Sequence, residues 1–155
     1  MQLSTYEVIE RELTRLMRSL EHAHRRMLQA GDVPHHLERA AHRLLAHIVD
    51  GGPVRLSVLA ELACVDTSTA SRQISQLEAQ GLVARQTDPA DGRAALLAAT
   101  DDGAKLLLRT RAARGRFVRE LVGAWPSTDR KELGRLLTQF NDGVAQSTSS
   151  RQGVS

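Results

Sequence analysis

Cysteine and long apolar runs are scarce in this chain. Only one of its 155 residues is a cysteine, which excludes an intramolecular disulfide and fits a reducing compartment. No apolar run approaches the roughly 20 residues that a membrane-spanning helix needs. The N-terminal stretch lacks the basic and then apolar order of a signal peptide. We therefore expect a cytoplasmic protein with no membrane partner.

The chain also lacks the motifs that most enzymes and metal proteins carry. It has no phosphate-binding glycine loop, no Cys-x-x-Cys and no Ser-His-acid order with a nucleophile elbow. Its six histidines all precede residue 48, but a metal site needs three or four converging ligands, and no such set is evident. We expect no catalytic residue, no cofactor and no resident metal. The histidines are expected at the surface or in a pocket, where one or two could pair with an acidic effector or respond to pH.

Length and charge are those of one globular domain without a strongly basic region. The chain is 41% hydrophobic and 25% charged, which is typical of a single folded domain. Its net charge of +3 is weak evidence for a nucleic-acid partner, and residues 54–93 hold four arginines against five acidic residues. A DNA-binding interpretation therefore rests on geometry. The arginines that would face DNA are Arg72, Arg85 and Arg93, with Glu61, Glu78 and Asp88 facing away.

A short helix and a tight turn are predicted from residue 56 onward. Apolar residues recur at helical spacing over Leu56–Leu62, and Ser57 is placed to cap the first amides. Ala63, Cys64 and Val65 form the turn, where a small buried hydrophobe is expected. We interpret Cys64 as structural, with a redox-sensing thiol as the alternative.

A second helix follows the turn directly. Asp66 is predicted as its N-cap, and Gly81 suits the left-handed conformation that often ends helices. Ala70, Ile74 and Leu77 share one face of this helix. Two short helices joined in this way form a helix-turn-helix, whose second helix can enter a DNA major groove.

The opposite face of the second helix is rich in small and donor-bearing side chains. Arg72 could pair with a guanine through two hydrogen bonds, and no carboxylate appears on the helix before Glu78. The alternative is an ordinary solvated surface. The candidate DNA-binding residues on this helix are Ser68, Thr69, Ser71, Arg72, Ser75 and Gln76, with Gln73 on a flank.

Two short strands joined by a turn are predicted next. Residues 82–87 and 93–99 flank a Pro/Asp/Gly segment at 88–92 that has turn composition. A hairpin directly behind a recognition helix is a wing, and Arg93 at its edge could enter a minor groove or hold a phosphate. Residues 54 and 55 are expected to form a short strand that pairs with the wing.

Amphipathic helices are predicted on both sides of this region. Residues 3–29 repeat apolar side chains at three- and four-residue steps, and further helices are predicted at 35–49, 101–123 and 128–141. The fold class is therefore mainly α with a small hairpin. The helix at 3–29 has more apolar surface than the winged region can cover, so a partner is expected.

The segment from Leu59 to Leu107 resembles the winged helix-turn-helix core of the MarR family of bacterial transcriptional regulators. The matching positions are the Leu-Ala pair of the first helix, Ser71-Arg72, Leu77-Glu78, Gly81-Leu82-Val83, Asp91-x-Arg93 and Thr100-Asp101-Asp102-Gly103. The resemblance implies that Arg93 reads the minor groove while Asp91 steadies the wing. It also implies that the major groove is faced by Ser68, Thr69, Ser71, Arg72 and Ser75.

The resemblance further implies a homodimer in which the first and last helices of two protomers interlock. We divide the chain accordingly into an N-terminal dimerisation helix (1–34), a winged helix-turn-helix (35–100), a long helix with a C-terminal dimerisation helix (101–145) and a disordered tail (146–155). Two recognition helices would read a pseudo-palindromic operator in double-stranded DNA.

Regulation by a small molecule is implied in the same way. The expected protein is a repressor that an aromatic or weakly acidic effector releases from DNA. One alternative is a redox- or metal-sensing regulator on the same fold. The other is a dimeric protein-interaction module that has lost specific DNA binding.

Overall fold

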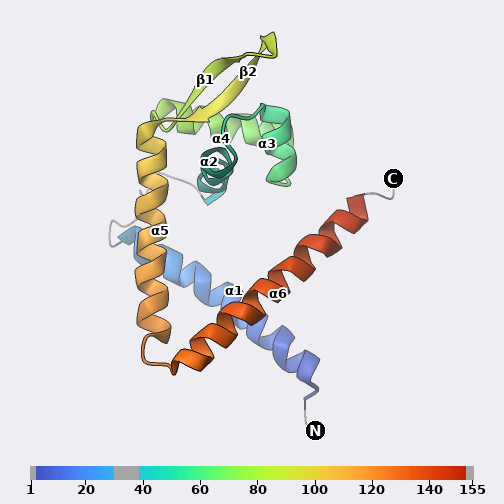
Figure 1. Ribbon diagram of the computed structural model, residues 1–155, viewed down its shortest axis with the longest axis vertical. Helices are drawn as coiled ribbons and strands as arrows, with labels where there is room; N and C mark the ends of the chain where they lie inside the picture. The colour runs from blue at the N-terminus through green and yellow to red at the C-terminus, as the bar shows by residue number, and fades with distance from the viewer. Residues whose placement is uncertain (1–2, 30–38, 153–155) are drawn as a thin grey trace. The chain divides into compact units, whose positions relative to one another are not determined.

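The computed structural model describes residues 3–29 and 39–152 of the chain. The fold is mainly helical with one two-stranded antiparallel sheet, which confirms the predicted class. Within these two ranges, no helix combines the length and apolar character that a membrane crossing requires. The elements in chain order (Figure 1) are α1 (Thr5–Gln29), α2 (Arg39–Gly51), α3 (Leu56–Leu62), α4 (Thr67–Ala79), β1 (Val83–Asp88), β2 (Asp91–Ala99), α5 (Asp101–Val122) and α6 (Ser127–Gln152).

The core of the winged helix-turn-helix forms where α2, α3 and α4 pack together and against the hairpin (Figure 1). It belongs to the first of two compact units, Met1–Ala113 and Arg114–Ser155, which we describe separately. The side chains that bury completely or almost completely in this core are Leu45, Ile48, Leu59, Ile74, Leu77 and Leu97. The predicted apolar faces of α2 and α4 are thereby confirmed, except that Leu37 and the break predicted at residues 31–34 lie outside the described residues.

The end of α4 is fixed by a glycine in a left-handed conformation. Gly81 has φ of 70°, and its amide donates to the Glu78 carbonyl at 2.9 Å. The next amide, that of Leu82, reaches back to the Leu77 carbonyl at 2.9 Å. These two bonds form a Schellman motif, in which a residue with a Cβ would be strained at the glycine position. The predicted C-terminal stop of the helix is confirmed.

Thr100 joins the end of the hairpin to the start of α5. Its hydroxyl accepts from the Gly103 amide at 3.1 Å, which confirms the predicted N-cap, and donates to the Gly81 carbonyl at 2.6 Å. Its own amide donates to the Leu82 carbonyl at 3.1 Å. The first turn of α5 lies so close to this backbone that a Cβ on Gly103 would stand 2.1 Å from the Leu82 oxygen. Only glycine fits at that position.

The predicted cap of α3 is wrong. The helix begins at Leu56, so the capping position belongs to Arg55, whose side chain makes no cap hydrogen bond. Ser57 lies inside the first turn, where its hydroxyl is not at the capping position. The segment before it is held instead by Val54, whose backbone exchanges hydrogen bonds of 3.0 and 2.8 Å with Leu97. This isolated bridge confirms the predicted pairing with the wing at Val54, whereas Arg55 is not part of a strand.

The prediction that Cys64 is buried is also wrong. Its side chain is exposed, and its backbone adopts φ of 54° in the turn between α3 and α4. The turn reverses the chain through this left-handed residue, which directs the thiol to solvent rather than into the core.

The C-terminal helix is longer than predicted. α6 continues to Gln152, so the disordered tail predicted from residue 146 is wrong for residues up to 152, while 153–155 lie outside the described residues. No proline interrupts the segment, and the Ser147 hydroxyl donates to the Val144 carbonyl at 2.8 Å. The bond to the preceding turn satisfies the serine hydroxyl without interrupting the helix.

We predict that Gly103→Ala destabilises the fold by about 1–3 kcal/mol, because overpacking against a backbone carbonyl forces the α5 start to shift. Chemical denaturation followed by circular dichroism measures the change. The matched control is Gly115→Ala on the same helix, where a Cβ would meet no atom within 4 Å. There the higher helix propensity of alanine should stabilise the protein by up to about 1 kcal/mol. Equal effects of the two substitutions would contradict the prediction.

Candidate nucleic-acid interface

The outward face of α4 presents most of the predicted DNA-binding side chains to solvent. Ser68, Arg72 and Ser75 are exposed, and the Arg72 guanidinium has no ion-pair partner in the described part of the chain. Thr69, Ser71 and Gln76 are half-buried at the edges of this face. Gln73, which was assigned to a flank, is only 3% exposed, because it lies three residues after Ala70 and four before Leu77, on the face of α4 that packs into the core. Gln73 is therefore not available to DNA.

Asp66 organises the first turn of α4. Its carboxylate accepts the Thr69 amide at 2.8 Å and the Thr69 hydroxyl at 2.7 Å, and it also accepts the Ser68 hydroxyl. The predicted N-cap is confirmed. The Ser68 hydroxyl, followed by the hydroxyl and amide of Thr69, lowers the pKa of the Asp66 carboxyl below its ordinary value of 3.8.

These bonds determine what the hydroxyls can offer to a ligand. The protons of Ser68 and Thr69 point to Asp66, so their outward lone pairs are acceptors. The Ser75 hydroxyl donates to the Ser71 carbonyl at 3.0 Å and is an acceptor for the same reason. In a major groove such acceptors suit the amino groups of adenine and cytosine, whereas Arg72 is a donor that suits guanine.

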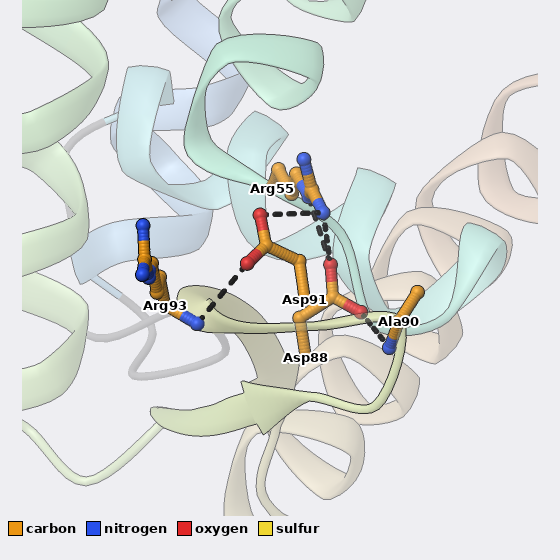
Figure 2. A network of polar contacts seen from close by, with 5 residues as sticks. All are labelled: Arg55, Asp88, Ala90, Asp91 and Arg93. Atoms are coloured by element: carbon orange, nitrogen blue, oxygen red, sulfur yellow. Dashed lines mark hydrogen bonds and ion pairs between the residues drawn. The ribbon is translucent and has the colours of Figure 1, made fainter.

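The wing carries Arg93 on an irregular part of its second strand. The hairpin pairs regularly from Val83↔Ala99 to Thr87↔Ala95, and the next pair is Asp88↔Asp91. Residues 92–94 of β2 therefore have no paired residue on β1. The turn is also tighter than predicted, because only two residues separate the strands. Arg93 lies in this bulge, exposed, with its side chain directed away from the acidic residues beside it (Figure 2).

A network of charged groups lies beside Arg93 at the turn of the wing (Figure 2). The Arg55 guanidinium donates to one Asp88 oxygen from Nε at 2.8 Å and from Nη2 at 2.5 Å. Its Nη2 is also 3.7 Å from Asp91. The other Asp88 oxygen accepts the Ala90 amide at 2.9 Å, and the other Asp91 oxygen accepts the Arg93 amide at 3.1 Å. The Ala90 amide and then the Arg55 guanidinium lower the pKa of Asp88, and Asp88 in turn raises the pKa of Arg55.

The acidic residues of this region are therefore largely engaged within the protein. Asp88 and Asp91 face Arg55, and Asp66 caps α4. Glu78 holds Arg85, which was expected on the DNA side, through two bonds of 2.9 and 3.3 Å, so its charge is engaged between the hairpin and α4. The arginines of residues 54–93 that remain for an external anion are Arg72 and Arg93.

Sequence reasoning missed Arg55. Its partner Asp88 is 33 residues away, and the pairing follows from the bridge between Val54 and Leu97. The signal available in the sequence was only the expected strand at residues 54 and 55, which places Arg55 at the edge of the wing.

The histidines and the cysteine do not converge on a metal site among the described side chains. Within these ranges no three His, Cys, Asp or Glu residues form a group that could hold a metal ion. His42 is buried in α2 at 6% exposure and His47 is half-buried, whereas His22 is exposed and lies 2.9 Å from the Arg18 carbonyl through Nδ1. The side chains of His24, His35 and His36 lie outside the described residues.

A helix-turn-helix with an exposed recognition face and a basic wing residue defines a winged helix DNA-binding protein, and comparison with known proteins agrees. Residues 37–95 match the model of the MarR family. The chain is 34% identical over 135 residues to the uncharacterized HTH-type transcriptional regulator YxaD of Bacillus subtilis, covering 87% of this chain and 92% of that protein. The chain belongs to the MarR family, and it is a DNA-binding transcriptional regulator.

Solved structures of this family have the same fold. A MarR family protein from Bacillus stearothermophilus superposes with a TM-score of 0.81 at 16% identity, covering 94% of this chain and 99% of that one. The PcaV transcriptional regulator from Streptomyces coelicolor, solved in complex with its natural ligand, gives a TM-score of 0.59 at 23% identity. It matches 83% of this chain and 91% of its own.

We predict that Asp66→Ala lowers the thermal midpoint of unfolding most at neutral pH. The folded-state pKa of Asp66 is depressed, so its stabilising contribution is fully present above about pH 4, the unfolded value, and is lost as the pH falls through the folded value. Differential scanning calorimetry measures the thermal midpoints of wild type and variant at pH 7 and pH 3. The difference between the two midpoints should be smaller at pH 3 than at pH 7. Glu61→Ala, which removes an exposed carboxylate of α3 that caps no helix, serves as the control. A difference in midpoint that is the same at both pH values would contradict the role of ionised Asp66 as the cap of α4.

Proposed function

We propose that this chain is a homodimeric, ligand-responsive repressor that reads a pseudo-palindromic operator. The observation that carries the proposal is the distribution of charge in residues 54–93. Four of the five acidic residues are engaged by internal partners, whereas Arg72 on α4 and Arg93 on the wing remain exposed. Two separate cations on a recognition helix and a wing suit two neighbouring grooves of one duplex.

In this proposal α4 reads bases in the major groove. Arg72 lies at the centre of the exposed face and pairs with the O6 and N7 atoms of a guanine. Ser68 and Ser75 flank it with acceptor oxygens that suit adenine or cytosine amino groups. Thr69, Ser71 and Gln76, which are half-buried, contact phosphates or sugars at the edge of the groove.

The wing extends the contact into the adjacent minor groove. Arg93 is exposed and directed away from Asp88 and Asp91, so its guanidinium is available to the negative potential of a narrow groove. Asp91 supports it through the bond between its carboxylate and the Arg93 amide.

Dimerisation is proposed because the terminal helices expose apolar side chains. Tyr6 of α1 is 83% exposed, and Met17 of the same helix is 62% exposed. The apolar side chains of α6 that are nearly half exposed are Leu136, Leu137, Phe140 and Val144. Residues at this spacing form one face of a helix, and a soluble protein seldom leaves such faces open. We assign residues 1–34 and 101–145 to the dimerisation region on this basis.

A dimer sets the form of the operator. Two recognition helices related by a two-fold axis read half-sites about 10 base pairs apart. A small molecule that changes their separation weakens binding, and the regulator PcaV, solved with its natural ligand, supports an effector in this family. We propose an aromatic or weakly acidic compound, and release of DNA on its binding.

We predict that Arg72→Ala weakens sequence-specific binding by about 1–3 kcal/mol, because a bidentate guanine contact is lost. Fluorescence anisotropy on DNA from immediately upstream of the chain's own gene, with a scrambled duplex as reference, measures the difference. Arg111→Ala is the matched control, since Arg111 pairs with Asp50 at 2.6 Å outside the recognition face. An Arg72 variant that discriminates between the duplexes as well as wild type does would refute the role of α4.

We predict that Phe140→Glu on α6 converts the protein to a monomer, because a charge in a buried apolar interface costs more than the interface gains. Light scattering after gel filtration should give twice the chain mass of 17.0 kDa for wild type and the single value for the variant. The control is Lys131→Glu, at an exposed position on the opposite face of the same helix. A dimeric Phe140 variant, or a monomeric wild type, would contradict the proposal.

A further inference from the structure

We propose that Arg55, the residue immediately before α3, is a positioning residue that holds Arg93 in place for DNA by neutralising the two carboxylates at the turn of the wing. This inference rests on the proposed function of Arg93 in the minor groove and adds a residue to it. Arg55 would contribute to DNA affinity without itself touching the nucleic acid.

The contacts in Figure 2 connect Arg55 to Arg93 in two steps. The guanidinium of Arg55 approaches one oxygen of Asp91 at 3.7 Å, and the other oxygen of Asp91 accepts the Arg93 amide at 3.1 Å. The same guanidinium binds Asp88 twice, at 2.8 and 2.5 Å. Because Asp88 pairs directly with Asp91 in the hairpin, Arg55 fixes both ends of the turn at once.

The backbone at Arg93 depends on this support more than its neighbours do. The register skips residues 92–94, so regular pairing with β1 does not hold the chain there. The side-chain bond from Asp91 to the Arg93 amide replaces it. A carboxylate that is itself anchored by Arg55 keeps that bond in one place.

Arg55 also offsets negative charge beside Arg93. Asp88 and Asp91 would place two negative charges next to a residue that has to approach phosphates, and charges within a few ångströms interact strongly when partly buried. The Asp88 side chain is 9% exposed, so water screens it poorly. Arg55 offsets these charges. Its guanidinium is engaged by both carboxylates, which distinguishes it from Arg72 and Arg93.

A double-mutant cycle between Arg55→Gln and Arg93→Ala tests the proposal. The probe is a duplex that the wild-type protein selects from a random pool of DNA, and dissociation constants are measured by anisotropy over a range of salt concentrations. Arg55→Gln should weaken binding on the order of tenfold in the wild-type background and hardly at all once Arg93 is alanine, because coupled residues are non-additive. The salt dependence of Arg55→Gln should equal that of wild type.

Two control series keep the result interpretable. Because Arg55→Gln leaves Asp88 as a poorly screened carboxylate, the whole cycle is repeated in an Asp88→Asn background, where the fold no longer needs the cation. The same non-additivity is expected there, with a smaller loss. Arg111→Gln is the matched control: its side chain is 45% exposed against 44% for Arg55, and it also binds a carboxylate. It should leave affinity unchanged in both backgrounds.

The outcomes separate the possible failures. Additive losses in the cycle would overturn the positioning role of Arg55 while leaving the regulator intact. The slope of the logarithm of the binding constant against the logarithm of salt concentration could instead fall by about one in Arg55→Gln. That result would show that Arg55 contacts a phosphate directly, and it would also overturn the positioning role. A wild-type protein that selects no sequence from the pool would overturn the proposed function, and this inference with it.

Discussion

The backbone of Leu82 carries the junction on which the DNA-binding half of the fold depends. Its amide ends α4 by bonding to the Leu77 carbonyl, and its own carbonyl receives the Thr100 amide at the end of the hairpin. The first turn of α5 lies against the same carbonyl at Gly103. The end of α4, the end of the hairpin and the start of α5 therefore meet at the backbone of one residue. A side chain is excluded at Gly81 by its positive φ and at Gly103 by the close approach of the Leu82 carbonyl.

Charge pairing explains how a region with more acids than bases can be suited to DNA. Net charge counts every ionised group equally, whereas a polyanion meets only those that are exposed and uncompensated. Arg55 and Arg85 compensate carboxylates inside the hairpin and α4, and Asp66 is occupied with its own helix. The arginines of residues 54–93 that no carboxylate of the described chain holds are Arg72 and Arg93.

The features that could be predicted from the sequence are those determined over a few residues. The Asp66 cap, the Gly81 stop and the buried stripe of α4 each depend on spacing within one helix, and all are confirmed. The features that were missed or predicted wrongly depend on tertiary contacts and on turn geometry. Arg55 contacts Asp88 only because the chain folds back over 33 residues. The solvent exposure of Cys64 follows from a left-handed backbone conformation that the sequence of the turn does not predict.

In other cases the sequence predicted the helix correctly but not the role of a single residue in it. Ser57 lies two residues beyond Arg55, which occupies the capping position of α3, since the start of α3 is set by the bridge at Val54. Gln73 was assigned to a polar flank because of its side chain, although its position faces the core. The DNA-facing roles of Ser68, Thr69, Ser71, Arg72, Ser75, Gln76, Asp91 and Arg93 remain predictions.

The face of α4 that holds the fold and the face that meets solvent share almost no residues. Ala70, Ile74 and Leu77 are fully buried, while Ser68, Arg72 and Ser75 contribute nothing to the core. After gene duplication, substitutions at the second set can therefore accumulate without loss of folding. If these residues read the operator as proposed, one copy can acquire a new binding sequence while its scaffold stays unchanged, and related regulators can diverge in the genes they control long before they diverge in structure.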